Sequence, residues 1–183
     1  CVDLNTLHPV WAANVTDDSD STVALDERPD GSVWLYTGCE VDLQKNGGKA
    51  YIRCFDALTG RLRWEYGEVC TWDDALNGGV LGSPLVGQGP VDGLVYFHVA
   101  KTREGGGALI AFDKQTGEVA WRQAFRRYGW SSPVAVYGAQ GEAHLLLGDS
   151  GGNFRLMDAR TGEVLDLITL TGNVEGSPAV FGD

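Results

Sequence analysis

The chain has 183 residues, with 26 glycines, 43% apolar side chains and a formal net charge of −11. This acidic composition argues against binding to nucleic acid, which needs a clustered basic surface, and against binding to an anionic membrane surface. No apolar run is long enough to span a bilayer. Because no long helical periodicity is present, we expect an all-β fold with many turns.

In chain order, short apolar runs separated by polar turns recur in groups of four, which predicts four-stranded antiparallel units. The expected units are a partial unit at 1–15, complete units at 22–67, 80–125 and 131–168, and a partial unit at 174–183. In the two partial units, we expect a fourth strand over 9–15 and a first strand over 174–181.

The turn between the third and fourth strands carries a repeated motif, seen most fully over 113–121. An Asp is followed by Thr three residues later, Gly four residues later and Trp eight residues later. The Asp and Thr side chains can accept hydrogen bonds from the turn, and Gly permits a positive φ. Each Trp brings about 150–250 Å² to bury, so we expect it to pack one unit against the next. The copies are Asp3, Thr6 and Trp11; Asp56, Thr59, Gly60 and Trp64; Asp113, Thr116, Gly117 and Trp121; and Asp158, Thr161 and Gly162, where Asp166 takes the place of Trp.

A second repeat, Ser-Pro, opens a strand at Ser83, Ser132 and Ser177. Ser132 and Ser177 each lie 19 residues after a motif Asp, and Thr22 lies at the same offset in the first copy. Because proline has no N–H, the strand that it opens is expected at the edge of its sheet.

Together, these repeats resemble the pyrroloquinoline-quinone-type (PQQ-like) β-propeller repeat, whose tryptophan docking motif is Ala-x-Asp-x-x-Thr-Gly-x-x-x-Trp. The matching residues are Ala111, Asp113, Thr116, Gly117 and Trp121. The resemblance covers nearly the whole chain and implies a β-propeller of four-stranded antiparallel blades, with the first strand of each blade lining a central channel. One branch of that family scaffolds outer-membrane protein assembly without catalysis, and others form extracellular sensor domains.

The spacing of the motif locates three insertions. The motif Asp residues are 53, 57 and 45 residues apart, and the excess falls at 40–48, 68–79 and 101–107. In a four-stranded blade, the loop after the second strand and the loop to the next blade leave the same face. We therefore expect all three insertions on one face, and we predict binding there because binding residues concentrate on loops held by a rigid scaffold.

The candidate residues for binding a partner or ligand come from this face. Trp72 lies outside the docking pattern and could stack on a sugar, a quinone or a peptide side chain; the alternative is that it covers the rim of the core. Asp73 or Asp74 could instead cap a turn that ends at Asn77. The basic side chains could recognise an acidic partner, pair with loop carboxylates or remain solvated. The full set is Glu40, Asp42, Trp72, Asp73, Asp74, Arg103, Arg126 and Arg127.

No metal site or catalytic residue is predicted. Asp17, Asp18 and Asp20 could offer oxygen ligands to calcium, but their spacing lacks the order of known calcium loops, which favours a solvated linker. The histidines lie far apart in the repeat, and none accompanies a Ser or Cys nucleophile.

The repeat separates the four cysteines into two pairs. Cys1 and Cys54 each lie two residues before a motif Asp, at a position expected to face the packed interior. Cys39 and Cys70 lie in inserted loops of one blade, where a disulfide is possible if the loops converge; the alternative is two free thiols. A disulfide would indicate an exported protein. We expect an extracytoplasmic location, which is periplasmic, secreted or at the cell surface.

These observations favour a non-catalytic propeller scaffold that binds a protein or a cell-surface ligand and needs no cofactor. A quinoprotein dehydrogenase is the alternative, and the resemblance then implies bound PQQ and calcium. Such enzymes commonly carry an adjacent cysteine pair, which this sequence lacks. A carbohydrate-binding propeller and an unrecognised hydrolase are further alternatives.

The expected strands do not form a closed set, since four first, third and fourth strands accompany only three second strands. An open arc of blades exposes unpaired edges, which invite self-association. Either the chain belongs to a longer propeller of about six to eight blades, or two chains join into one ring. We expect the longer propeller.

Overall fold

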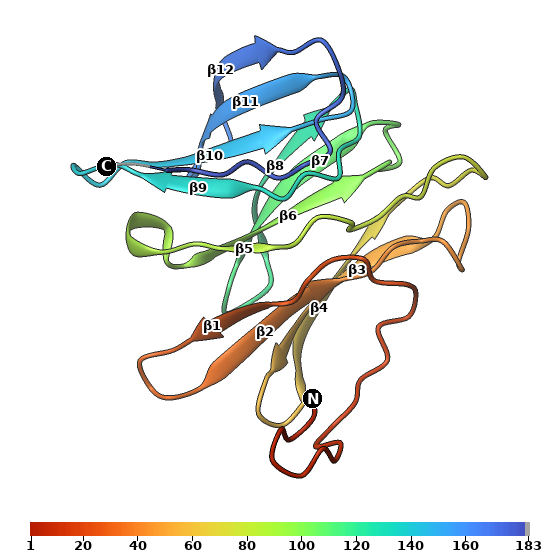
Figure 1. Cartoon of the computed structure of the whole chain (residues 1–183), viewed down its shortest axis with the longest axis vertical. Helices are drawn as coiled ribbons and strands as arrows, with labels where there is room; N and C mark the ends of the chain where they lie inside the picture. Colours follow the sequence, from red (N-terminus) through yellow and green to blue (C-terminus); the bar gives the residue numbers. More distant parts are fainter. Residues whose placement is uncertain (182–183) are drawn as a thin grey trace.

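The computed structural model describes residues 1–181 and confirms an all-β fold of three four-stranded antiparallel sheets. Figure 1 shows the three sheets following one another, from β1–β4 to β9–β12. The first sheet contains β1 (Ala24–Glu27), β2 (Val33–Gly38), β3 (Lys49–Asp56) and β4 (Leu62–Val69). The second contains β5 (Leu85–Val86), β6 (Leu94–Ala100), β7 (Gly107–Asp113) and β8 (Val119–Phe125), with a 3₁₀ turn, η1 (Gly89–Val91), between β5 and β6. The third contains β9 (Val134–Tyr137), β10 (Ala143–Gly148), β11 (Asn153–Asp158) and β12 (Val164–Thr169).

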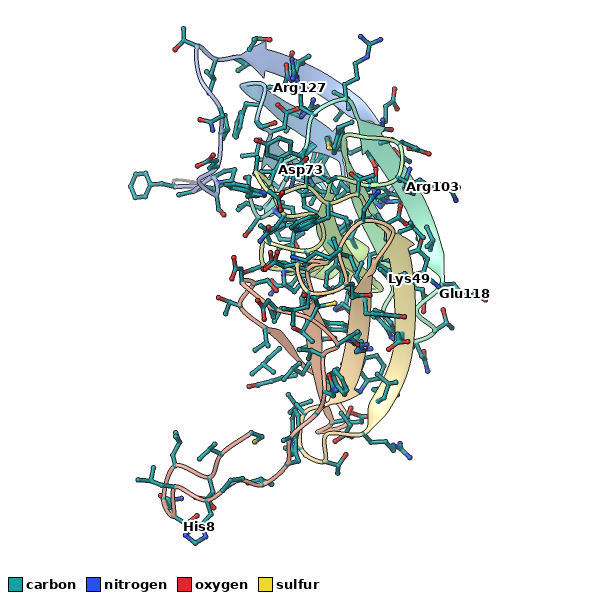
Figure 2. All side chains as sticks on the ribbon, turned by 90° about the vertical axis from the view of Figure 1, so that its right-hand side faces the viewer. His8, Lys49, Asp73, Arg103, Glu118 and Arg127 are labelled. Atoms are coloured by element: carbon teal, nitrogen blue, oxygen red, sulfur yellow. The ribbon has the colours of Figure 1, made fainter. Side chains whose placement is uncertain are left out.

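Within each sheet, the strands lie in chain order, so the first and fourth strands form the two edges. Pro84 and Pro133 directly precede the edge strands β5 and β9, as the missing proline N–H requires. The fourth strands β4, β8 and β12 follow one another along the convex side of an arc in Figure 2. The sheets are therefore stacked side by side as consecutive blades.

The core lies between neighbouring blades. Strands β6 and β7 are buried along nearly their whole length, because the middle blade has a sheet on each side. One apolar cluster joins Trp34 and Tyr36 of the first blade to Phe97 and Phe112 of the second. A second cluster joins the middle blade to β10 and β11, so two apolar interfaces hold the three blades together.

The motif turns adopt one geometry. In the third copy, Asp113 Oδ1 accepts the N–H of Gln115 at 2.9 Å and that of Thr116 at 2.8 Å, and the Thr116 hydroxyl donates to the same oxygen at 3.1 Å. The next residue, Gly117, has φ +75°. Equivalent glycines in the second and fourth copies have φ +72° and +76°, so the three turns have the same left-handed backbone conformation at this residue.

Each motif Trp lies on the motif Gly of the following blade. A Cβ on Gly117 would approach Trp64 to 2.6 Å, and the indole Nε1 of Trp64 donates to the Lys114 carbonyl at 2.7 Å. Trp11 and Trp121 make the same indole bond to the residue after the next motif Asp, at 2.9 and 3.1 Å. The Trp ring thus fills the space that the missing Cβ leaves, and its polar atom satisfies a turn carbonyl.

A second series of bonds runs between the entries to the first strands. The Thr22 N–H donates to Ser83 Oγ at 3.1 Å, the Ser83 N–H to Ser132 Oγ at 2.9 Å, and the Ser132 N–H to Ser177 Oγ at 3.0 Å. The repeated hydroxyl therefore links each unit to the previous one along the inner edge.

Two expectations about the chain ends were wrong. Residues 9–15 and 174–181 form no strands, and the first segment makes only an isolated bridge between Val2 and Pro9. A strand needs a continuous hydrogen-bonded partner strand, whereas among the described residues these segments make only isolated backbone bonds, such as Val174 N–H to the Asp149 carbonyl. Cys1, expected in the interior, is exposed, and its amino group donates to the Trp11 carbonyl. Residues 182–183 of the last predicted unit lie outside the described residues.

Candidate interaction surface

The three insertions meet and form one layer, which we call the insertion surface (residues 40–48, 68–79 and 101–107). The Gly47 N–H donates to the Cys70 carbonyl, and the Thr71 N–H donates to the Lys101 carbonyl, at 3.0 and 2.7 Å. Isolated bridges join Glu40 to Gly79 and Gly79 to Ala100. The loops leave the right-hand side of Figure 1, and Figure 2 looks directly onto them.

The Asp17 side chain holds the first inserted loop. Its two carboxylate oxygens accept the N–H groups of Leu43 and Gln44, each at 2.9 Å. Burial raises the pKa of Asp17, but these backbone donors and that of Asp18 outweigh it, and the net pKa is lowered. Asp17 therefore serves as a loop cap. Within residues 1–181, no three His, Cys, Asp or Glu side chains gather in a metal-binding arrangement.

Trp72 is already engaged within the insertion surface. Its Nε1 donates to Asp42 Oδ1 at 3.0 Å, and the Lys45 ammonium lies 3.9 Å from the ring centroid. The ring also packs against the apolar cluster of the first two blades. The alternative that Trp72 covers the rim of the core fits these contacts, and Asp42 acts as its hydrogen-bond acceptor.

Asp73 caps a turn and binds a buried lysine. Its Oδ1 accepts the Ala75 N–H at 3.0 Å, and its Oδ2 forms a salt bridge with Lys101 Nζ. Lys101 Nζ also donates to the Leu76 carbonyl at 3.1 Å. The bond from Lys101 lowers the pKa of Asp73, so this pair fastens the second insertion to the third.

Glu40 is 1% exposed and accepts a hydrogen bond from Asn77 Nδ2 at 3.0 Å. Burial raises the pKa of Glu40 to about 7, and the charges of Asp20 and Asp42 act in the same direction. Glu40, in the first insertion, is therefore buried beneath the surface. Its hydrogen bond with Asn77 joins the first insertion to the second.

The remaining candidates are solvent-exposed. Asp74, Arg103, Arg126 and Arg127 are all exposed and form no salt bridge within the part of the chain that the structure describes. Figure 2 labels Arg103 and Arg127 on the face that carries the loops. These side chains keep their charge available to a partner.

Cys39 and Cys70 are buried and free in the structure, which corresponds to the alternative of two thiols. The Tyr51 N–H donates to Cys39 Sγ at 3.3 Å, and Cys70 Sγ donates to the Glu68 carbonyl at 3.6 Å. Burial raises the pKa of Cys70 to about 12 and also raises that of Cys39. Both sulfurs are thus protonated and satisfied by nearby backbone. Cys54 is buried, as expected.

His98 belongs to a buried polar cluster formed by residues of the second and third blades. Its Nδ1 contacts the Ser131 carbonyl at 2.9 Å, while its Nε2 has no partner among residues 1–181. Burial lowers the pKa of His98 to about 4, so the ring is neutral near pH 7. The neighbouring Arg155–Asp149 ion pair, 2.6 Å long, adds to this structural cluster.

A pocket of about 290 Å³ opens beside the second insertion. Asp74 of its lining was predicted as a site residue, but Asp20, Leu81 and Trp130 were not. The repeat contains a signal for them. Asp20, Leu81 and Trp130 each lie two residues before the hydroxyl residue that opens a first strand. Three consecutive blades therefore contribute one side chain each. The lining is Asp20, Asp74, Ala75, Leu76, Asn77, Leu81 and Trp130.

Comparison with known proteins gives one consistent family. Residues 10–182 match the family model described as "Outer membrane protein assembly factor BamB". A curated protein of that name from Legionella pneumophila (strain Paris) is 33% identical over 75 residues, which is 40% of this chain and 18% of the relative.

Solved structures share the fold. BamB from Moraxella catarrhalis superposes with a TM-score of 0.59 at 21% identity, covering 94% of this chain and 44% of that one. Quinohemoprotein alcohol dehydrogenase ADHIIG from Pseudomonas putida HK5 superposes with a TM-score of 0.64 at 17% identity, covering 92% and 31%. The chain thus spans less than half of the length of these proteins.

Proposed function

The chain belongs to the family of outer membrane protein assembly factor BamB, and on that basis we propose that it is a non-catalytic propeller scaffold that binds a protein partner through the insertion surface. The family match over residues 10–182, which includes all three blades, carries this proposal. The setting we propose is extracytoplasmic, in outer membrane protein assembly, with no cofactor required. The described residues include no helix of the length and apolarity needed to cross a membrane.

The insertion surface has the properties of a preorganised binding platform. Its loops are bonded to one another through Gly47, Thr71 and Gly79, so a partner need not order them on binding. Loops that are already ordered lose less conformational entropy when they bind. The opposite face carries tight motif turns of a few residues, which leave little variable surface for recognition.

A quinoprotein dehydrogenase fits the residues less well. Calcium in such a site would take several oxygen ligands at once. Among the described residues, no three His, Cys, Asp or Glu side chains gather in such an arrangement. No two cysteines are adjacent in the sequence. With added PQQ and calcium, we expect no dye reduction by alcohols; reduction that requires both additions would favour the enzyme.

A carbohydrate platform at Trp72 is also disfavoured. Sugar stacking needs an open aromatic face, whereas the Lys45 ammonium lies 3.9 Å from this ring centroid. Binding on a glycan array that is lost in Trp72→Ala would reverse this conclusion.

The test of the scaffold proposal is site-specific photo-crosslinking in the native host. A photoreactive residue placed at Arg103 or Arg127 should give an adduct that mass spectrometry identifies as an outer membrane protein assembly component. The matched position is Gln115, which is exposed on a motif turn at the opposite end of the blade. Equal adduct yield at Gln115, or no such adduct from either Arg103 or Arg127, would refute the proposal.

A further inference from the structure

Glu40 lies where three segments of the chain meet. Its N–H donates to the carbonyl of Asp18, in the linker over 16–21, at 2.9 Å. Its side chain accepts the amide of Asn77 at 3.0 Å, and its backbone forms an isolated bridge with Gly79, so two contacts reach the second insertion. Glu40 is 1% exposed, so water competes little for its side-chain contact. Glu40 therefore ties the linker, the first insertion and the second insertion together.

The linker and the first insertion present acidic groups to Glu40. The Asp20 side chain shares a hydrogen bond with the Glu40 carboxyl group, and Asp42 adds a second negative charge nearby. Asp17 is engaged elsewhere, because its carboxylate caps the first inserted loop. The lysine of this insertion, Lys45, forms its salt bridge with Asp42. Neither segment therefore supplies a cation to Glu40.

The second and third insertions supply none either. Asn77 is neutral, and the Lys101 ammonium is bound to Asp73 and to a backbone carbonyl. Asp74 adds a further carboxylate to the lining of the pocket beside Asn77. In the part of the chain that the structure describes, no lysine or arginine forms a salt bridge with Glu40. Its charge would stand uncompensated in a buried site.

The hydrogen bonds of Glu40 suit only its protonated form. A neutral carboxyl group has one O–H to donate to the Asp20 carboxylate, and its other oxygen still accepts the Asn77 amide. An ionised carboxylate only accepts, so Glu40 and Asp20 would then be two acceptors facing each other. Burial, together with the neighbouring acidic charges, raises the pKa of Glu40 to about 7. The junction is therefore fully bonded in one protonation state and not in the other.

We propose that the Glu40 carboxyl group is a pH-sensitive latch on the insertion surface, closed when it is neutral and loosened when it ionises. Loosening frees the second insertion from the first, beside the pocket of about 290 Å³ that Asp20 and Asn77 line. Because ordered loops lose less conformational entropy on binding, the closed form is the one that favours a partner. This effect on binding rests on the proposed scaffold function.

The direction of the pH dependence follows from the two pKa values. In the loosened form, Glu40 meets water and titrates near 4.5, its ordinary pKa, whereas in the closed form its pKa is about 7. The latch is therefore complete below pH 4.5 and is lost as the pH rises through 7. Over this range, the ratio of loosened to closed form should rise on the order of 100-fold.

Native-state amide hydrogen exchange of the whole chain, read by NMR and corrected for the intrinsic rate at each pH, measures this opening. The probes are the N–H of Glu40, bonded to the linker, and the N–H of Val41, bonded to the Gly78 carbonyl at 3.1 Å. Their opening constants should rise on the order of 100-fold between pH 4.5 and pH 7. The control is the Asp113 N–H, bonded to the Glu118 carbonyl in a motif turn at 2.9 Å, which should not show this rise.

Two variants test the assignment. Glu40→Gln is neutral at every pH and keeps both an acceptor for Asn77 and a donor for Asp20, so it should abolish the rise. A variant that merely loosened the loops would instead raise the opening constant at every pH. Asp20→Asn removes the facing carboxylate without altering the buried residue, so the rise should level off about 1 pH unit lower. Circular dichroism checks both folds, and Glu118→Gln, which removes an exposed charge from a motif turn, should leave the profile unchanged.

Three results would each overturn the latch: opening constants at Glu40 and Val41 that do not change with pH, an equal rise at Asp113, or an undiminished rise in Glu40→Gln. Crosslinking separates the latch from the scaffold function. A partner adduct from Arg103 without a pH effect on the probe amides would refute the latch and leave the scaffold function standing. If neither Arg103 nor Arg127 gives an adduct but the amides open with pH as expected, the latch stands and the scaffold function fails.

Discussion

Replacing Trp64 tests whether the motif Trp fastens adjacent blades. Its side chain is 8% exposed and lies near Tyr36 and Phe112, with ring centroids 6.0 and 5.8 Å away. Its Nε1 donates to the Lys114 carbonyl at 2.7 Å. Trp64→Ala removes the buried ring and the donor together, so we expect the free energy of unfolding to fall by about 3–5 kcal/mol.

Trp64→Phe separates the two contributions, because it keeps an aromatic ring but leaves the Lys114 carbonyl without its donor. That variant should lose about 1–3 kcal/mol. Equilibrium urea unfolding, followed by circular dichroism, measures both losses. For a chain of this size, 1 kcal/mol corresponds to about 2–4 °C in Tm, so Trp64→Ala should melt about 6–20 °C lower.

The control is Trp72→Ala, which removes a half-buried Trp from the insertion surface. Its indole bonds to a side chain of the same surface, and it joins no two motif positions. We expect a clearly smaller loss than for Trp64→Ala. If Trp64→Ala costs less than about 1 kcal/mol, or no more than the control, the motif Trp does not hold the blades together.

Three further predictions concern the turns and the buried titratable groups. Gly117→Ala should destabilise more than Gly31→Ala in urea unfolding, since both have positive φ but only the former would place a Cβ 2.6 Å from Trp64; equal losses would contradict this. The pKa of Glu40 is raised from 4.5 to about 7, so its stabilising contribution is complete below pH 4.5 and is lost as pH rises through 7. Unfolding of Glu40→Gln against wild type between pH 4 and 8 should show that slope only in wild type. The pKa of His98 is lowered from 6.5 to about 4, so its contribution is complete above pH 6.5 and is lost as pH falls toward 4. His98→Phe should remove this acid-dependent loss in the same titration, and an unchanged slope would refute the assignment.

The blades could be predicted from the sequence because the chain repeats its own local chemistry. Asp113, Thr116 and Gly117 form a turn from contacts within a few residues, and equivalent residues form equivalent turns. The same information could not predict the ends. Residues 9–15 have a strand-like pattern, but a strand also depends on a neighbour that the pattern does not supply.

The insertion surface could be predicted as a location but not as a set of contacts. The spacing of the motif placed Trp72 and Asp73 together on one face. Their partners, Asp42 and Lys101, are about 30 residues away in the chain and follow no periodicity. Loop side chains pair through the path of the inserted backbone, which a local pattern does not encode. Asp17 was assigned to a solvated linker for the same reason, whereas its buried carboxylate binds the first inserted loop.

The charges on and beside the insertion surface fall into two classes according to their partners. The Lys101–Asp73 pair is already formed, so it holds the loops together and offers little charge to a partner. Arg127 is exposed and forms no salt bridge in the described chain, and the same holds for Asp20 and Asp74 of the pocket. Exposed charges are screened beyond about 8 Å at physiological salt. The pocket carboxylates and Arg127 therefore act on partner groups that come within about that distance. Because the two signs of charge lie at different places, they would set the orientation of a bound partner as well as its affinity.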